Sequence, residues 1–457
     1  MRKILFLILT LFLFVWFTAC GGSSNNNNGG GGGDNTPKIS ISPTSANLLV
    51  GQSTTLTANV QNVSDTHVSW SVQETSGGTV TQTNTGAIYT APWPVGTYHV
   101  VVTSVANSSL TATATFSVSA AFAYMQEYPS GDATPFSMTP QIGTFAADGT
   151  FTVSGLTDTD TGKPVSVAME SVMLSSDGTK GVYNIATPDK TYDVFIANLS
   201  GTGATTTQLT TDGNSWYPEL SADGLQIIYI RADDLWAMNM DGSNQHAVFE
   251  TASNNANYVD SATFSPDGTK IAAEIEWNPG GVYYDGIAIM NAEGSNAVPL
   301  TGGPDFPCST GWDEAPAFTH DGTQIMFSRW CEDDNTEGLY IINTDGTGLT
   351  PLYPATTGIF HYNPIPVADK IVFQTNQDFP NSGAPIPFEI YSMNLDGSSV
   401  TRLTNNTVYD GFDDMWYDWS VSLSAQRALR ATPGKLVPHG AARRADRIRN
   451  QREKHLR

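Results

Sequence analysis

Three histidines in the middle of the chain, His246, His320 and His361, have side chains suited to act as a general base or to bind a metal ion. They stand at three different points of a repeated motif, so their spacing does not bring the imidazole rings to one site. The chain also contains no Gly-x-Ser-x-Gly sequence, the turn that exposes the nucleophilic serine of many hydrolases. We therefore predict a non-catalytic protein that needs no cofactor.

Two acidic stretches contain the oxygen ligands that Ca²⁺ prefers in proteins. They are Asp158-Thr-Asp160-Thr-Gly162 and Glu332-Asp-Asp-Asn335. Neither stretch has the full spacing of an EF-hand loop. Two alternatives stay open for both: a Ca²⁺ site, and a turn whose carboxylates face water.

Cys308 and Cys331 lie at nearly equal distances on either side of the sequence His320-Asp-Gly322. Asp-Gly favours a tight turn between antiparallel strands, so the two cysteines would lie on adjacent strands or their extensions, within reach of a disulfide. Two thiols without a histidine at ligand spacing make a metal site a poor interpretation. We predict a structural disulfide, a bond typical of exported proteins.

A motif repeated along the middle of the chain organises the region around these residues. Its clearest copy is Ser265-Pro-Asp-Gly-Thr-Lys-Ile-Ala-Ala, followed by Ile289-Met-Asn-Ala-Glu-Gly. Glycine accepts the positive φ of a tight turn without steric cost, so each copy predicts a hairpin. Each unit then contains four antiparallel strands, and its period of about 40–50 residues is that of a β-propeller blade. Further copies are Leu220-Ser-Ala-Asp-Gly, Phe318-Thr-His-Asp-Gly, Ala237-Met-Asn-Met-Asp-Gly, Ile341-Ile-Asn-Thr-Asp-Gly and Ser392-Met-Asn-Leu-Asp-Gly.

These motifs resemble the TolB-like β-propeller family, whose blades carry the same Ser-Pro-Asp-Gly and Met-Asn-x-Asp-Gly sequences. The resemblance covers residues 121–420 and implies an all-β fold with a six-bladed β-propeller. It also implies a location in the bacterial cell envelope and a role in protein contacts. The chain lacks the α/β domain that precedes the propeller of TolB itself, so the specific partners of TolB do not follow from the resemblance.

The two ends of the repeat region complete each other. Residues 121–157 match the second, third and fourth strands of a blade, and Asp413-Asp-Met-Trp-Tyr-Asp-Trp-Ser420 matches a first strand. Joining them predicts a sixth blade that closes the ring. Closure would leave no exposed edge strand at either end of the region.

Acidic and aromatic residues precede the innermost strands when the blades are aligned on their first turns, and they would share one mouth of the central channel. Aromatic side chains supply large contact areas, and carboxylates attract cations and basic peptides. This ring is the candidate binding site for a cation, a sugar or a basic peptide; the alternative is a polar mouth that only faces water. Its residues are Glu170, Trp216, Asp260, Asp313, Glu314, His361, Tyr362 and Asp414.

The N-terminus resembles a bacterial lipoprotein signal peptide. A charged start precedes an apolar run, and the run ends in Phe17-Thr-Ala-Cys20, which looks like a lipobox. By this resemblance residues 1–19 are removed and Cys20 carries the lipid, while Gly21 favours the outer membrane over the inner one. The alternative is an ordinary secretory signal with an incidental cysteine.

Two further segments separate this anchor from the propeller. Residues 20–37 are rich in Gly and Asn and would form a flexible tether. Residues 38–119 contain short alternating runs that are typical of a β-sandwich, and their motifs resemble bacterial immunoglobulin-like domains. Trp70 would fill the space between the two sheets. Such a domain could bind carbohydrate or act as a spacer, and we favour the spacer.

The formal charge of −23 is unevenly distributed. Residues 421–457 hold ten Lys and Arg against two acids, a net charge of +8, and residues 1–420 hold 11 Lys and Arg against 42 acids, a net charge of −31. An acidic surface of this size repels phosphates, so we do not expect nucleic-acid binding. The basic, irregular tail 421–457 either binds anionic lipid or the acidic propeller, or is a segment of foreign composition without selected structure; we favour the second alternative.

Together these features predict an envelope-anchored lipoprotein whose propeller serves as a non-catalytic platform for envelope proteins or peptides. Two alternatives remain. One is a propeller-type polysaccharide lyase or hydrolase, which a metal near His361 would favour. The other is a glycan-binding surface protein that uses Trp216 and Tyr362.

Overall fold

A computed structural model describes residues 35–128, 137–155, 169–175, 180–186, 192–198, 206–308, 311–378, 388–405 and 409–411. The predicted signal peptide, Cys20, the stretch 158–162, Asp414 and the tail 421–457 lie outside these residues. Contacts divide the described residues into two compact units, one made mainly of residues 35–119 and one of residues from 120 onward.

The first unit consists of two sheets that share one apolar core. One sheet has the order β1-β3-β6-β5, and the other contains β2, β4, β7 and the first part of β8. Alternate residues of β7 are buried, as expected for strands with one face toward a core. The strands are β1 (Lys38–Ser42), β2 (Ser45–Leu49), β3 (Ser53–Gln61), β4 (Val68–Val72), β5 (Thr79–Thr83), β6 (Gly86–Thr90), β7 (Gly96–Ser104) and β8 (Thr111–Tyr128).

Tyr89 and Phe116 fill the centre of this sandwich. Their rings stack with centroids 4.7 Å apart, and both side chains are fully buried. Trp70 packs against the same core but is only partly buried. Trp70 therefore contributes to the core as predicted, but Tyr89 and Phe116, which sequence analysis did not single out, fill its centre.

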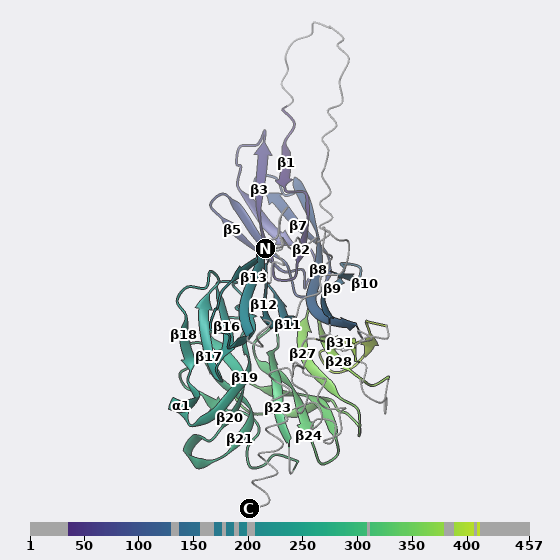
Figure 1. The fold of residues 1–457 in the computed structure, drawn as a ribbon. Helices are drawn as coiled ribbons and strands as arrows, with labels where there is room; N and C mark the ends of the chain where they lie inside the picture. Colours follow the sequence, from purple (N-terminus) through teal and green to yellow (C-terminus); the bar gives the residue numbers. More distant parts are fainter. Residues whose placement is uncertain are drawn as a thin grey trace, which may run out of the picture. The chain divides into compact units, whose positions relative to one another are not determined.

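The second unit contains five consecutive four-stranded antiparallel sheets, each following the order of its strands in the chain (Figure 1). We number them blades 1 to 5. Blade 1 consists of β11 (Met169–Leu174), β12 (Lys180–Ala186), β13 (Tyr192–Asn198) and β14 (Thr206–Gln208), and blade 2 of β15 (Ser215–Leu220), β16 (Gln226–Arg231), β17 (Asp234–Asn239) and β18 (His246–Phe249). Blade 3 consists of β19 (Ala256–Phe264), β20 (Lys270–Trp277), β21 (Tyr284–Asn291) and β22 (Val298–Pro299). Blade 4 consists of β23 (Gly311–Phe318), β24 (Gln324–Cys331), β25 (Thr336–Asn343) and β26 (Thr350–Tyr353), and blade 5 of β27 (His361–Val367), β28 (Lys370–Thr375), β29 (Glu389–Asn394) and β30 (Thr401–Arg402).

A sixth blade joins the two ends of the repeat region. β31 (Tyr409–Gly411) pairs antiparallel with β8 through Asp410 and Gln126, β8 pairs with β9 (Ser137–Phe145), and β9 pairs with β10 (Phe151–Gly155). This strand order is the predicted one, and the fold is a six-bladed β-propeller. The described part of the first strand, β31, precedes the predicted range 413–420, which lies outside the described residues.

Apolar side chains between successive blades form the propeller core. In one such cluster Ala272 and Ile287 of blade 3 pack against Phe318, Ile325 and Phe327 of blade 4. Similar clusters join blades 1 and 2, blades 2 and 3, and blades 4 and 5. Each sheet is therefore covered on its faces by its neighbours, as the repeat requires. The described part of the chain contains only short helical turns, α1 (Thr251–Asn254) and η1 (Pro279–Gly281), and none of its helices has the length and apolar character of a membrane span.

The two kinds of repeated turn use glycine for different reasons. In the first turn of blade 3, Gly268 has a φ of +69°, and a Cβ added there would meet nothing within 4 Å. In the second turn, Gly294 has a φ of +85°, and its Cβ would lie 1.8 Å from the carbonyl oxygen of Val248 in blade 2. The equivalent Gly397 stands against Leu352 of the preceding blade in the same way. In blades 3 and 5 the second-turn glycine is thus needed both for backbone conformation and for the close approach of two blades.

We predict that Gly294→Ala destabilises the propeller more than the matched control Gly268→Ala. The control adds only the strain of a left-handed alanine, about 1 kcal/mol. Gly294→Ala adds a clash with a neighbouring main chain, for a total of about 3 kcal/mol. Urea unfolding of the two variants measures the difference, and equal losses of stability would contradict the proposed contact between blades.

Candidate functional site

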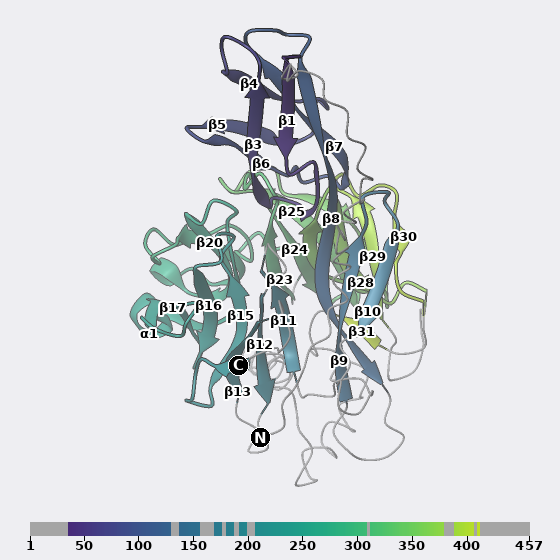
Figure 2. The ribbon, with the colours of Figure 1, turned by 90° about the horizontal axis from the view of Figure 1, so that it is seen from above.

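The first strands of the blades lie toward the middle of the ring, and later strands lie farther out. Figure 2 shows β15 nearer the middle than β16 and β17, and it shows β28, β29 and β30 progressively farther from it. The first strands therefore position any residue that faces the channel. The candidate residues Trp216, Asp313, Glu314, His361 and Tyr362 all belong to such strands.

A repeated bulge places these residues at one level of the ring. The pairing register shifts after Trp216 in β15, after Glu314 in β23 and after Tyr362 in β27. The residue that follows each of them has a left-handed backbone, with φ of +47°, +51° and +48°. A proline comes next in all three strands. Trp216, Glu314 and Tyr362 therefore occupy equivalent positions in blades 2, 4 and 5.

The depth of these residues differs from the prediction. They lie inside the first strands instead of before them, and their exposed fractions are low: Trp216 2%, Asp313 0%, Glu314 1%, His361 3% and Tyr362 1%. Asp260 lies in the bulge of β19 and is partly exposed. Glu170 belongs to β11, and Asp414 lies outside the described residues. The five buried residues are core positions, so these five side chains do not line an open, water-filled mouth.

Asp313 forms a buried ion pair with Arg329 of the neighbouring strand. Arg329 donates from Nε to Oδ1 at 2.6 Å and from Nη2 to Oδ2 at 2.8 Å. The guanidinium also lies 4.8 Å from the ring centroid of Phe306 and 4.7 Å from that of Tyr340. Burial raises the pKa of Asp313, and the contact with Arg329 opposes this shift. Both partners belong to blade 4, so the ion pair stabilises the packing within that blade.

Four buried carboxyl groups lie near one another at the junction of blades 3 and 4, and Arg329 pairs with one of them, Asp313. We call Glu276, Asp285, Asp313 and Glu314, together with Arg329, the junction cluster. Burial raises the pKa of Asp285 well above its ordinary value, and the charges of Glu276, Asp313 and Glu314 raise it further. Trp312 donates from Nε1 to Oε2 of Glu314 at 2.5 Å. The cluster therefore brings four carboxyl groups together in a buried part of the fold.

His361 belongs to the aromatic core of blades 4 and 5. Its Nδ1 is hydrogen-bonded to Oγ1 of Thr375 at 2.8 Å, and its ring centroid is 4.5 Å from that of Tyr353. Burial lowers the pKa of His361 to about 3, so the imidazole is neutral at pH 7. A buried, neutral histidine packed in this way is a structural residue.

The other two histidines are remote from His361 in the repeat. His320 lies in the first turn of blade 4, where burial lowers its pKa, and His246 is exposed at the start of β18. No group of three or more His, Cys, Asp or Glu side chains in the described ranges could hold a metal ion.

Glu332 and Asn335 bound the turn between β24 and β25, where Oδ1 of Asp334 accepts a hydrogen bond from Thr336.

The two half-buried cysteines form the predicted disulfide. Cys308 and Cys331 are bonded, with Cα atoms 5.7 Å apart. Cys331 ends β24 and is the register partner of Gly311, and Cys308 lies in the loop before β23. The bond therefore joins the extension of one strand to the end of its neighbour, as counting from the central turn predicted.

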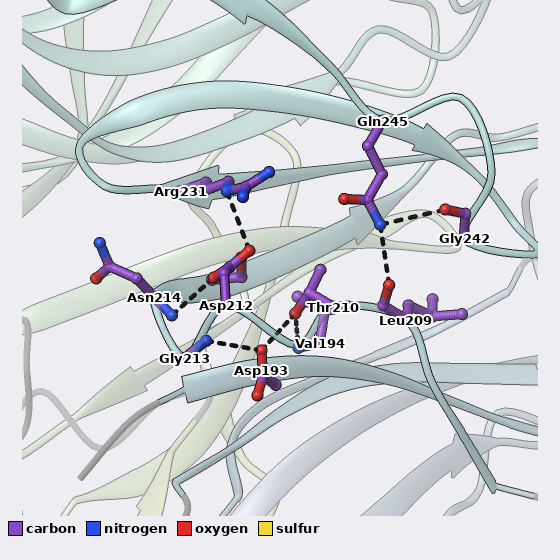
Figure 3. A network of polar contacts seen from close by, with 11 residues as sticks. Asp193, Val194, Leu209, Thr210, Asp212, Gly213, Asn214, Arg231, Gly242 and Gln245 are labelled. Carbon is purple, nitrogen blue, oxygen red and sulfur yellow. Dashed lines mark hydrogen bonds and ion pairs between the residues drawn. The ribbon is translucent and has the colours of Figure 1, made fainter.

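A recurrent pairing of an acid with a threonine holds the outer strands, and sequence analysis missed it. In blade 1 the Thr210 hydroxyl donates to Oδ1 of Asp193 at 2.9 Å and accepts from the Val194 amide at 2.9 Å (Figure 3). Thr251 donates to Asp234 in blade 2, and Thr404 donates to Glu389 in blade 5. The sequence pattern that could have revealed these pairs is an acidic residue near the start of each third strand, at 193, 234, 285, 337 and 389.

Blade 3 departs from this pattern. The Thr301 hydroxyl accepts from the Ile287 amide at 3.0 Å, as its counterparts do, but it bonds the Asp313 carboxylate of blade 4 instead of Asp285. Asp285 instead accepts a long hydrogen bond, 3.4 Å, from the Tyr283 hydroxyl.

Aromatic side chains fill the region beside the candidate residues. One cluster consists of Trp312, Trp330, Phe360, Tyr362 and Phe388 from blades 4 and 5, and Tyr217 of blade 2 packs against it. Trp216 belongs to a different core, between blades 2 and 3. Neither Trp216 nor Tyr362 offers an exposed ring face on which a sugar could stack.

The exposed acids of the propeller lie mainly on one face, at the repeated turns. Strands alternate in direction, so the turn between the first and second strands and the turn between the third and fourth emerge at the same edge of a blade. Hydrogen bonds from Ser and Thr hydroxyls and main-chain amides lower the pKa of most of these acids, as for Asp267 and Asp345. We call this surface the acidic turn face; its exposed carboxylates are Asp223, Asp241, Asp267, Glu293, Asp321, Asp345, Asp369 and Asp396.

Replacing His361 with Asn should reduce the loss of stability at acid pH. The folded-state pKa of about 3 lies below the ordinary value of 6.5, so stability is fully present above pH 6.5 and is lost as pH falls toward 3. This histidine contributes a slope of up to about 1.4 kcal/mol per pH unit in that window. Urea unfolding of the wild type and His361→Asn across the window measures the slope, with His246→Asn as the control for loss of a histidine. Equal slopes in the wild type and His361→Asn would contradict the buried, neutral state.

No protein-family model matches the chain, and no curated protein sequence matches it. Among solved structures, the chain is similar to putative TolB from Agrobacterium tumefaciens, with 15% identity and a TM-score of 0.44 over 64% of this chain and 91% of that one. It is similar to TolB from Acinetobacter baumannii, with 14% identity and a TM-score of 0.44 over 75% of this chain and 81% of that one. It is also similar to an oligogalacturonate lyase in complex with manganese, with 15% identity and a TM-score of 0.39 over 61% of this chain and 72% of that one. The strand pairing described above is what identifies this chain as a β-propeller protein.

Proposed function

We propose that this chain is a lipoprotein of the bacterial cell envelope, anchored through Cys20, and that its propeller is a non-catalytic platform for a basic protein surface. The motif at Phe17-Thr-Ala-Cys20 supports the anchor, and Gly21 after it supports a place at the outer membrane. The Gly- and Asn-rich segment that follows supports a tether, and the β-sandwich supports an immunoglobulin-like spacer between tether and platform.

The observation that carries the platform is the acidic turn face. Four successive blades present two exposed carboxylates each on the same side of the propeller. Their turns are fixed by internal hydrogen bonds, such as those from the Ser265 and Thr269 hydroxyls to Asp267 at 2.6 and 2.8 Å. Rigid carboxylates lose little conformational entropy on binding and attract lysine and arginine side chains.

The catalytic and glycan-binding alternatives rested on residues that the fold buries. His361 is enclosed by aromatic rings, and Trp216 and Tyr362 belong to hydrophobic cores. Catalysis requires side chains that reach a substrate, and stacking on sugars requires an exposed aromatic face. The exposed turns meet the requirement for protein contact instead.

Neutralising three acids on the turn face should abolish capture of the partner. Crosslinking in intact cells followed by mass spectrometry compares the wild type with Asp241→Asn/Glu293→Gln/Asp345→Asn. We expect at least a tenfold loss of the crosslinked proteins in this variant, because each substitution removes one fixed charge. The matched control Glu250→Gln/Asp305→Asn/Asp334→Asn changes the charge equally in loops at the opposite edges of blades 2 to 4. Equal capture by both triple variants would refute the acidic turn face as the binding surface.

The anchor has a separate test. Cys20→Ala should move the protein from the membrane fraction to the soluble fraction of the cell envelope, because the acyl chains supply the membrane affinity. Metabolic labelling with a clickable fatty acid should mark the wild type and not the variant. Retention of the label in Cys20→Ala would overturn lipidation at this residue.

A further inference from the structure

The loop of residues 302–308 connects blade 3 to blade 4, and we call it the strap. Its first end is fixed to blade 3, where the Asp285 amide donates to the Gly302 carbonyl oxygen at 3.0 Å. Gly302 has a φ of +75°, and a Cβ added there would lie 2.2 Å from the carbonyl oxygen of Asp285. Main chain therefore lies directly against main chain at this end of the strap.

The second end of the strap is fixed to blade 4 by the disulfide between Cys308 and Cys331. Between the two ends, the Phe306 amide donates to the Gly303 carbonyl oxygen at 3.0 Å, and this bond closes a turn that ends at Phe306. The ring centroid of Phe306 lies 4.8 Å from the guanidinium of Arg329. The strap thus carries an aromatic cover over the arginine of the junction cluster.

The counterpart of Arg329 in blade 2 shows how the strap changes the environment of the arginine. Arg231 pairs with Ser215 in the strand register, as Arg329 pairs with Asp313. The side chains of Arg231 and its ionic partner Asp212 are 31% and 21% exposed, whereas those of Arg329 and Asp313 are 7% and 0% exposed. Equivalent strand positions therefore hold a partly exposed ion pair in blade 2 and a buried one under the strap.

We propose that the disulfide is a redox-sensitive clasp that keeps the junction cluster dry. Both cysteines are half-buried, so a dithiol reductant can reach them from solvent. One thiolate of the reductant attacks a sulfur of the pair and breaks the bond, and its second thiol resolves the mixed disulfide. Cys308 and Cys331 leave as two thiols, and the reductant becomes the disulfide.

Reduction removes the bond from Cys308 to β24, so that end of the strap is held to blade 4 only through the main chain that continues to Gly311, while Gly302 still holds the other end. Phe306 then moves off Arg329, and water reaches the junction cluster. Water then competes for the hydrogen bonds between Arg329 and Asp313, so the first two strands of blade 4 loosen from blade 3 while the remaining blades keep their packing. The clasp thereby couples the redox state of the envelope to one junction of the propeller.

Hydrogen exchange read by mass spectrometry tests this proposal on the full chain, with and without dithiothreitol. On reduction, exchange should accelerate at least tenfold in the strap and in β23 and β24, and should stay unchanged in β15 and β16. The acceleration should follow the loss of the disulfide in time, as measured by mass. An unchanged strap after complete reduction, or uniform acceleration throughout the propeller, would overturn the clasp.

Two variants distinguish the effect of the disulfide from the effect of the Phe306 ring. Cys308→Ser/Cys331→Ser should show the fast exchange without reductant and should not respond to dithiothreitol. Phe306→Ala, with the disulfide intact, should accelerate exchange in β23 and β24 and leave exchange in the strap slow. Protection of β23 and β24 in Phe306→Ala equal to that of the wild type would show that the aromatic ring does not keep the junction dry.

Discussion

The pairing of β31 with β8 is the interaction on which the remaining structure depends. It joins residues 125–127 to residues 409–411 and so converts a row of sheets into a ring. In a ring every blade has a neighbour for each face, and the apolar residues between blades are withdrawn from water. The position of each first strand, and of the side chains it carries, follows from this closure.

Within the ring, polar residues are distributed by depth. Acids at the repeated turns are exposed and remain charged, whereas acids on the inner and third strands are enclosed and depend on local donors. Thr210 and Arg329 are two such donors. Exposed carboxylates are therefore available for contact with other molecules, whereas buried carboxylates hold the blades together.

The sequence predicted the strands and the closure well because both depend on local signals. Asp-Gly turns recur at a fixed spacing and set the strand order within each blade. The depth of the candidate site could not be predicted, because it depends on a bulge at Tyr217, Ala315 and Asn363 and on side chains from neighbouring blades. Burial of Trp216 and His361 is likewise a property of packing between sheets, and no single motif contains that information. The pairing of acids with threonines is also formed between strands, which explains why it was missed.

The outer strands of the propeller differ in length, and this difference affects how the protein can associate with itself. β22 and β30 have two residues each, and β14 has three, so their free edges offer few main-chain groups to another chain. β10 has five residues and includes the exposed Val153. Among the described residues β10 pairs with β9 alone, and an edge of that length is a template for β-sheet addition. Filament formation through main-chain pairing would therefore begin at the rim of the sixth blade.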